Sequence, residues 1–244
     1  MKKIITLFGL MLCMFATAQE AVDTMYIYRN DNVIERIPVS KIDSVVFVAP
    51  TPQYEAVDLG LPIGIKWATH NVGATKPEEY GGYYAWGETE EKEYYDWSTY
   101  KWCNGSYDTM TKYCTNSNFG TVDNKTVLEF EDDVAHVKWG GDWRMPTKEE
   151  QEELRDNCKW MWTNRNGVNG NKVIGPNGNS IFLPASGFRS RTDVFTKEEG
   201  GDYWSCSLQN HSNSYACSFY FGNCVYTSDI GDRVLGMPVR PVCE

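Results

Sequence analysis

The sequence predicts a loop-rich domain of the α+β class that follows a small β-rich unit. Only two stretches have helical character, and the rest of residues 54–244 alternates short apolar runs with glycine, asparagine, serine and proline. Nine tryptophans and fifteen tyrosines suit such a domain, because large flat side chains can anchor long loops. No repeat of solenoid length is present, so residues 54–244 are expected to form a single domain.

The first 18 residues are typical of a secretory signal. Two lysines precede an apolar segment, Ile4–Phe15, and Ala16–Ala18 supplies the small residues of a cleavage site. The apolar segment is too short to span a membrane. Cys13 suggests lipidation, but it follows Leu12, where a lipidation site needs a small residue. We therefore expect an exported chain (secreted, periplasmic or at the cell surface) after cleavage near Ala18.

The mature chain is acidic. The net charge is −10 for the whole sequence and becomes −12 when the two lysines of the signal leave. Nucleic-acid binding needs a cationic surface, so the charge disfavours a nucleic-acid partner and equally an anionic membrane surface. No segment after the signal is apolar and long enough to anchor the chain. Acidity also keeps an exported protein soluble, and it identifies no partner.

Residues 19–50 are expected to form the small β-rich unit. Met25–Tyr28, Val33–Ile37 and Ser44–Val48 have the composition of strands, with Asn30–Asn32 as the first turn. So few residues cannot bury a core of their own. We expect this unit to pack on the main domain or to add strands to another protein, and the following Pro-Thr-Pro to act as a stiff linker.

The most specific local signal is the start of a helix. Thr147 and Glu150 form a capping box, in which each side chain accepts a hydrogen bond from the other residue's backbone N–H. Gln151 and Leu154 recur at helical spacing, so a helix with one buried face is expected over residues 148–158.

Two other local predictions concern a second helix and two turns. The second helix is expected over Glu129–Val137, with two aspartates near its first turn. Asn166–Gly170 and Pro176–Asn179 are rich in glycine but are expected to form β-turns rather than phosphate-binding loops.

A series of motifs resembles one family of secreted bacterial proteins. Residues 143–150 are similar to the first eight positions of the W-R-(L/M)-P-T-x-x-E-(W/F) signature shared by formylglycine-generating-enzyme-like and C-type-lectin-like domains. Further motifs follow the order of the Fibrobacter succinogenes major paralogous domain family, at Val57–Pro62, Lys66–Thr69, Asn71–Ala74, Tyr84–Glu88, Asn179–Ala185, Tyr203–Ser205 and Val239–Val242. The resemblance covers residues 57–244 and implies a C-type-lectin-like fold, but a fold alone implies no activity.

The resemblance also raises the question of an enzyme. Formylglycine-generating enzymes oxidise a substrate cysteine with two cysteines that bind copper, and the nearest pair here, Cys217 and Cys224, lies in surroundings that do not match the enzyme motif. The calcium-binding Glu-Pro-Asn type of triplet of sugar-binding lectins is absent. The three histidines, His70, His136 and His211, form no metal-type pair. We expect no catalytic residue, no cofactor and no metal site.

Cysteine pairing is left open by the sequence. Seven cysteines remain after signal cleavage, and an odd number leaves at least one unpaired in an oxidising compartment. No Cys-x-x-Cys pair and no zinc-type spacing is present. Cys103 with Cys114 is the most local candidate for a disulfide.

The candidate binding site is the tail, residues 205–235. Tyrosine together with small polar residues gives an adaptable contact surface. The resemblance supports the same choice, because the exported C-type-lectin-like proteins include some whose C-terminal residues are varied by diversity-generating retroelements. The alternative is that these residues only occupy exposed turns and strand edges. The candidate ligand-binding residues are Gln209, Asn210, His211, Asn213, Tyr215, Tyr220, Asn223, Tyr226 and Asp229.

This hypothesis makes a geometric prediction. The tyrosines and asparagines of the tail should be largely exposed on one face, and Trp204 and Phe219 should point inward beneath them. If they are scattered, the binding hypothesis passes to the aromatic insertion Tyr94–Phe119.

The sequence thus favours a non-catalytic, adhesin-like protein that recognises an unknown protein or glycan ligand outside the cell. A structural or fimbrial-tip assembly component is the alternative, with the N-terminal strands joining a neighbour by β-augmentation. A formylglycine-generating-type oxidase is the third hypothesis.

Overall fold

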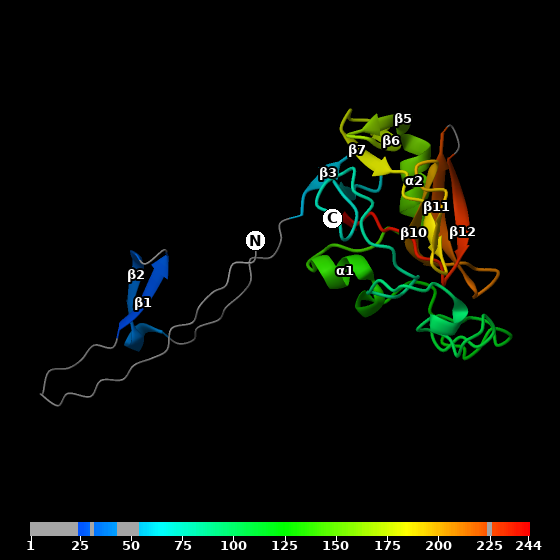
Figure 1. Ribbon diagram of the computed structural model, residues 1–244, viewed down its shortest axis with the longest axis horizontal. Coiled ribbons are helices and arrows are strands. Elements are labelled where there is room, and N and C mark those ends of the chain that lie inside the picture. The colour runs from blue at the N-terminus through cyan, green and yellow to red at the C-terminus, as the bar shows by residue number, and fades with distance from the viewer. Residues whose placement is uncertain (1–23, 30–31, 43–53, 224–225) are drawn as a thin grey trace, which may run out of the picture. The chain divides into compact units, whose positions relative to one another are not determined.

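The computed structural model describes residues 24–29, 32–42, 54–223 and 226–244 (Figure 1). The chain divides into two compact units, Met1–Pro50 and Thr51–Glu244, and each is described by itself. The expected signal peptide and the strand expected at Ser44–Val48 lie outside the described residues.

The first unit contains a two-stranded antiparallel sheet. Strand β1, Thr24–Arg29, pairs with β2, Asn32–Pro38, and a short 3-10 helix, η1, follows at Val39–Lys41. The two predicted strands are confirmed. Tyr26 and Val33 are substantially exposed, as expected for a hairpin that is too small to bury a core.

The second unit consists mostly of small antiparallel sheets with few helices, which is compatible with the expected loop-rich α+β domain; of all described residues, 38% lie in strands and 12% in helices. Its strands form small antiparallel sheets in the orders β13-β4-β3, β5-β6-β7, β8-β9 and β10-β11-β12. The strands are β3 (Ala56–Asp58), β4 (Lys66–Ala68), β5 (Lys159–Arg165), β6 (Val168–Ile174), β7 (Ser180–Pro184), β8 (Phe188–Ser190), β9 (Asp193–Phe195), β10 (Gly200–Leu208), β11 (Tyr215–Gly222), β12 (Tyr226–Asp232) and β13 (Val242–Cys243). The helices are α1 (Val134–Trp139), α2 (Lys148–Asn157) and the 3-10 helices η2 (Trp97–Thr99) and η3 (Phe130–Asp132).

Helix α2 begins where the capping box predicts. The Glu150 N–H donates to Thr147 Oγ1 at 3.2 Å, and the Thr147 N–H donates to Glu150 Oε2 at 2.8 Å. Arg144 adds a bidentate pair to the same carboxylate, at 2.7 and 2.6 Å. On the buried face, the Gln151 amide donates to backbone carbonyls of β10 and Leu154 is 2% exposed. The capping box therefore starts α2, and Gln151 joins the helix to the sheet that carries the tail.

The helix expected over residues 129–137 is instead broken into two. The 3-10 turn η3 ends at Asp132, and α1 starts after Asp133 and runs to Trp139. The Asp133 carboxylate accepts hydrogen bonds from the N–H groups of Ala135 and His136 and is therefore an N-cap. An N-cap residue is not helical, so this aspartate sets the boundary that the composition alone did not reveal.

The first predicted turn is confirmed at Asn166 and Gly167, whereas Val168–Gly170 belong to β6, and the second predicted turn is confirmed. Asn166 and Gly167 have φ values of 51° and 90° and join β5 to β6, in keeping with the primed turns that hairpins favour. At the second turn, the Gly178 N–H donates to the Gly175 carbonyl at 3.0 Å.

Two buried indoles tie β10 to the segment before the insertion. Trp204, which is fully buried as predicted, donates from Nε1 to the Tyr84 carbonyl at 2.9 Å. In the opposite direction, Trp86 donates from Nε1 to the Ser205 carbonyl of β10 at 2.8 Å. Each indole N–H is thus satisfied inside the core.

Arg240 links two of the sheets from within the core. Its guanidinium donates to Asn71 Oδ1 at 2.8 Å, to the Ala68 carbonyl at 3.1 Å and to the Phe182 carbonyl at 2.9 Å. Burial lowers the pKa of Arg240 to about 10, so the side chain keeps its charge and is held by oxygens of β4 and β7.

The cysteines of the described chain carry free thiols. The disulfide expected between Cys103 and Cys114 is not formed; the two buried thiols instead donate to separate carbonyls, those of Trp97 and Asn116, both at 3.2 Å. Cys224 lies outside the described residues.

Candidate functional site

The tail does not form the single exposed face that the sequence predicts. Asn210 and His211 are exposed in the turn between β10 and β11, and Asn223 is exposed beyond the opposite end of β11. Tyr215 and Tyr220 are half-buried rather than largely exposed. The asparagines at the two ends of β11 are separated by the length of that strand, so the tail by itself is removed as the binding site and the hypothesis passes to the aromatic insertion.

The two tyrosines also lie on different faces of β11. Side chains alternate along a strand, so Tyr215 shares a face with Phe219 and Phe221, whereas Tyr220 points to the other side. Phe219 is 2% exposed, which confirms its predicted inward direction.

Asn213 has a structural role instead of an exposed one. It is 1% exposed, and its Oδ1 accepts hydrogen bonds from the backbone N–H groups of Thr115 and Asn116 at 2.8 and 2.9 Å. The prediction that Asn213 is exposed is wrong, because a buried side-chain carbonyl is needed here to satisfy a loop that lacks secondary structure.

The remaining candidate residues have separate surroundings. The centroid of the Tyr226 ring lies 4.9 Å from that of the Trp160 ring in β5. The backbone of Asp229 pairs with Ser218 within the sheet, and its side chain is outside the described set. Gln209 Oε1 accepts a hydrogen bond from the neighbouring Asn210 N–H at 2.6 Å.

One part of the tail does face a cleft, and the aromatic insertion forms the opposite wall. The cleft has a volume of about 350 Å³. Its walls come from η2 and the loops of the insertion on one side and from the start of β11 and the end of β12 on the other. The lining residues are Trp97, Tyr107, Phe119, Ser212, Ser214, Tyr215 and Asp232.

The insertion that forms this wall has a core of its own. Tyr95, Tyr100 and Met110 are buried together with Val234, which follows the end of β12. Gly120 lets the backbone close on itself, since a Cβ at this position would lie 2.2 Å from the Met110 carbonyl oxygen. Trp97 and Phe119 pack against this core, so these two aromatic side chains of the cleft are carried by a packed segment.

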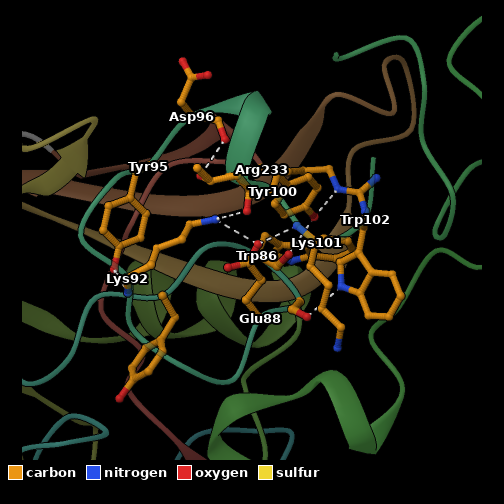
Figure 2. A network of polar contacts seen from close by, with 12 residues as sticks. Trp86, Glu88, Lys92, Tyr95, Asp96, Tyr100, Lys101, Trp102 and Arg233 are labelled. Carbon is orange, nitrogen blue, oxygen red and sulfur yellow. Dashed lines mark hydrogen bonds and ion pairs between the residues drawn. The ribbon is translucent and has the colours of Figure 1, made fainter. Parts of the chain in front are cut away.

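Arg233 fastens the insertion to the sheet. It is fully buried, and its guanidinium donates to Tyr100 Oη at 2.8 Å and to the carbonyls of Lys112, Tyr113 and Asn213 at 3.0–3.1 Å. The guanidinium also lies 4.8 Å from the centre of the Trp86 ring (Figure 2). This residue was not identified from the sequence, where a single arginine after β12 gives no sign of burial.

A second polar network holds the start of the insertion. Glu88 is 9% exposed, and its Oε1 accepts hydrogen bonds from Lys92 Nζ at 2.9 Å and from the Lys101 N–H at 2.8 Å (Figure 2). Asp96 caps η2 by accepting from the Ser98 N–H at 3.0 Å. These contacts fix the chain between Glu88 and Lys101.

Asp232 is the charged group of the cleft. It is the last residue of β12 and pairs across the sheet with Tyr215. Within the described chain, no hydrogen-bond donor or cation contacts its carboxylate, and burial alone raises the pKa of this carboxyl. A half-buried carboxylate without a protein partner, set among aromatic rings, is a group that a ligand can satisfy.

A larger hollow of about 570 Å³ lies elsewhere on the domain, between β3 and β7. It has mixed walls that include His70, whose pKa is lowered by burial, and Arg165, which pairs with Glu78 at 3.4 Å. None of the candidate tail residues lines it.

An acidic cluster at η3 is occupied by lysine. Carboxylate oxygens of Glu129, Glu131 and Asp132 lie close enough together to hold a cation. The Lys112 ammonium already contacts these three carboxylates, at 2.6, 3.5 and 2.6 Å. The cluster therefore has a structural explanation.

Comparison with family models, with curated proteins and with solved structures finds no match to this chain. Within the described residues, no helix has the length and apolar character needed to cross a membrane.

Proposed function

We propose that this protein is an exported, non-catalytic recognition protein that binds its ligand in the cleft between the aromatic insertion and the tail. The proposal rests on one observation, that the aromatic insertion and the tail line the same cleft. Tyr215 and Asp232 of the tail face Trp97, Tyr107 and Phe119 of the insertion around one concave space. Aromatic walls with a few polar groups are the usual chemistry of ligand sites.

We also propose that the domain has the C-type-lectin-like fold that its motifs imply. Three of those motifs supply structural groups: Arg144 with the capping box, Trp86 at the core, and Arg240 between the sheets. In this proposal the motifs build the frame, and the segment between residues 94 and 119 with the tail supplies the ligand specificity.

The described thiols near the candidate oxidase pair lack the lowered pKa of an activated thiol, and Cys224 of that pair lies outside the described residues. A thiol that acts as a nucleophile or metal ligand has a lowered pKa. Burial instead raises the pKa of Cys217 and raises that of Cys206 to about 12. These thiols are therefore protonated at neutral pH.

Assembly through the N-terminal unit is the second candidate function. The β1–β2 hairpin forms a two-stranded sheet, which is marginal by itself and gains stability when a further strand is added. Deleting residues 19–50 should abolish assembly with a partner subunit while leaving the binding activity of the cleft intact.

The recognition proposal is tested by binding to arrays of glycans and of peptides. Tyr107 is 54% exposed and lines the cleft, whereas Tyr94 is 40% exposed in the same insertion and does not. Binding signals should disappear in Tyr107→Ala and persist in Tyr94→Ala. Equal binding by the two variants would place recognition elsewhere.

The oxidase hypothesis has its own test. Purified protein incubated with a cysteine peptide, copper and oxygen should yield no formylglycine. Turnover that is abolished by Cys217→Ser would overturn the proposal.

A further inference from the structure

The charge of the cleft indicates the kind of ligand group that it accepts. Within the described residues, no lysine or arginine lines the cleft. The nearest arginine in sequence, Arg233, is directed away, since its guanidinium is fully engaged by Tyr100 and by backbone carbonyls. Among the described residues that line the cleft, only Asp232 carries a formal charge, and this charge is negative.

The remaining surface of the cleft is attractive to cations as well. Trp97, Tyr107, Phe119 and Tyr215 supply aromatic rings. The faces of such rings carry negative potential and attract ammonium groups, the more so where the cation has lost water. An anionic group would meet both the rings and the carboxylate and would be repelled.

We propose that the cleft binds an alkylammonium group of its ligand, with the cation against the Asp232 carboxylate and between the aromatic rings. This inference rests on the proposed recognition function and specifies its chemistry. A volume of about 350 Å³ is near the lower limit of ligand pockets, so the cleft accommodates a side-chain-sized group rather than a large molecule. A lysine side chain and an amino sugar both present that chemistry.

Two pairs of probes separate charge from shape. N-acetyl-lysine methylamide is compared with its neutral Nε-acetylated form, and glucosamine is compared with glucose. Binding is measured by calorimetry and by chemical shifts of the cleft residues. The charged member of at least one pair should bind at least about tenfold more tightly than its neutral counterpart, as expected for a hydrogen bond to a charged group. The pair that shows the difference identifies the source of the ammonium group.

Asp232→Asn should remove that preference, whereas Asp193→Asn, which alters an exposed aspartate of β9 outside the cleft, should preserve it. Neutral probes that bind as tightly as charged ones, or an Asp232→Asn variant with unchanged affinity, would overturn the ammonium inference while the cleft remains a recognition site. Absence of binding by all four probes would also overturn the inference, and the glycan and peptide arrays would then decide the proposed function separately.

Discussion

The two ends of strand β11 are built from similar residues but have different surroundings. At the start of the strand, Tyr215 and the neighbouring Asp232 face the aromatic insertion across a cleft. Beside the far end, Tyr226 at the start of β12 pairs with Phe221 and packs against Trp160 and the hydrophobic cluster around β5. Tyrosine and small polar residues are therefore a poor guide to a binding surface until the neighbouring segment is known.

The difference arises from what lies opposite each end. The start of β11 faces a separately packed segment that leaves a gap, whereas the far end faces a sheet whose side chains fill the space. The following predictions test whether one end serves binding and the other serves stability.

The largest effect is expected at Arg233, which fixes the insertion that forms the cleft. Arg233→Met leaves several buried carbonyls without donors, at a cost of roughly 1–3 kcal/mol for each unsatisfied group. We expect a loss of at least about 3 kcal/mol in urea unfolding, together with proteolytic cleavage within residues 94–119. Arg165→Met, at an exposed arginine, is the control and should change stability by less than about 0.5 kcal/mol. A fully stable Arg233→Met variant would show that the insertion is held by other contacts.

Trp160 tests the far end of β11. Its ring contacts Phe219 at 5.2 Å and Tyr226 at 4.9 Å, so Trp160→Ala should cost roughly 2–4 kcal/mol because a partly buried aromatic ring is lost. Ligand affinity measured on the folded variant should be unchanged.

Tyr107→Ala should show the reverse, with stability within about 0.5 kcal/mol of the wild type and binding abolished. Loss of binding in Trp160→Ala would remove the distinction between the two ends.

Thr147→Ala tests helix α2, which supports the sheet at both ends of β11. Helix α2 packs against the β10-β11-β12 sheet through Gln151, and the capping hydrogen bond contributes about 1 kcal/mol. The melting temperature should therefore fall, and the affinity of the cleft for its ligand should not change. A larger effect on binding than on melting would mean that α2 positions the cleft directly.

The smallest effect is expected at Asp232. Burial raises the pKa of this carboxyl above its ordinary value of 3.8, so the native state holds the proton more tightly than the unfolded chain does. Stability is therefore lost as the pH rises from the ordinary to the raised value, and the loss persists above it. Asp232→Asn removes that loss and should be more stable at pH 7 by less than about 1 kcal/mol, because solvent screens a half-exposed group. Urea unfolding between pH 3 and 8 measures the difference, which should vanish at the acid end. A variant that is less stable at pH 7 would show that the carboxylate has a structural partner.

The local features of the fold could be predicted from the sequence. The capping box at Thr147, the Asn166–Gly167 turn and the first two strands depend on residues a few positions apart, and each is present. The boundary at Asp133 was missed because an aspartate near a helix start can lie within the first turn or cap it.

The candidate site could be predicted only in part. Tyr215 lines the cleft, whereas Asn213 and Arg233 acquire their roles from residues 98 and 120 positions away in the sequence. No local pattern marks such long-range contacts. The motifs that resemble a family lie outside the insertion, so they leave these contacts undetermined.

The most direct test uses two tryptophans as reporters, one at each end of β11. Trp97 lines the cleft and Trp160 packs at the far end. The protein is labelled with 5-fluorotryptophan, and the two ¹⁹F resonances are assigned with Trp97→Phe and Trp160→Phe. A fragment library of alkylammonium compounds, neutral sugars and aromatic molecules is then titrated. We predict that fragments shift the Trp97 resonance and leave that of Trp160 in place. Shifts confined to Trp160, or at neither residue, would contradict the assignment of the cleft as the recognition site.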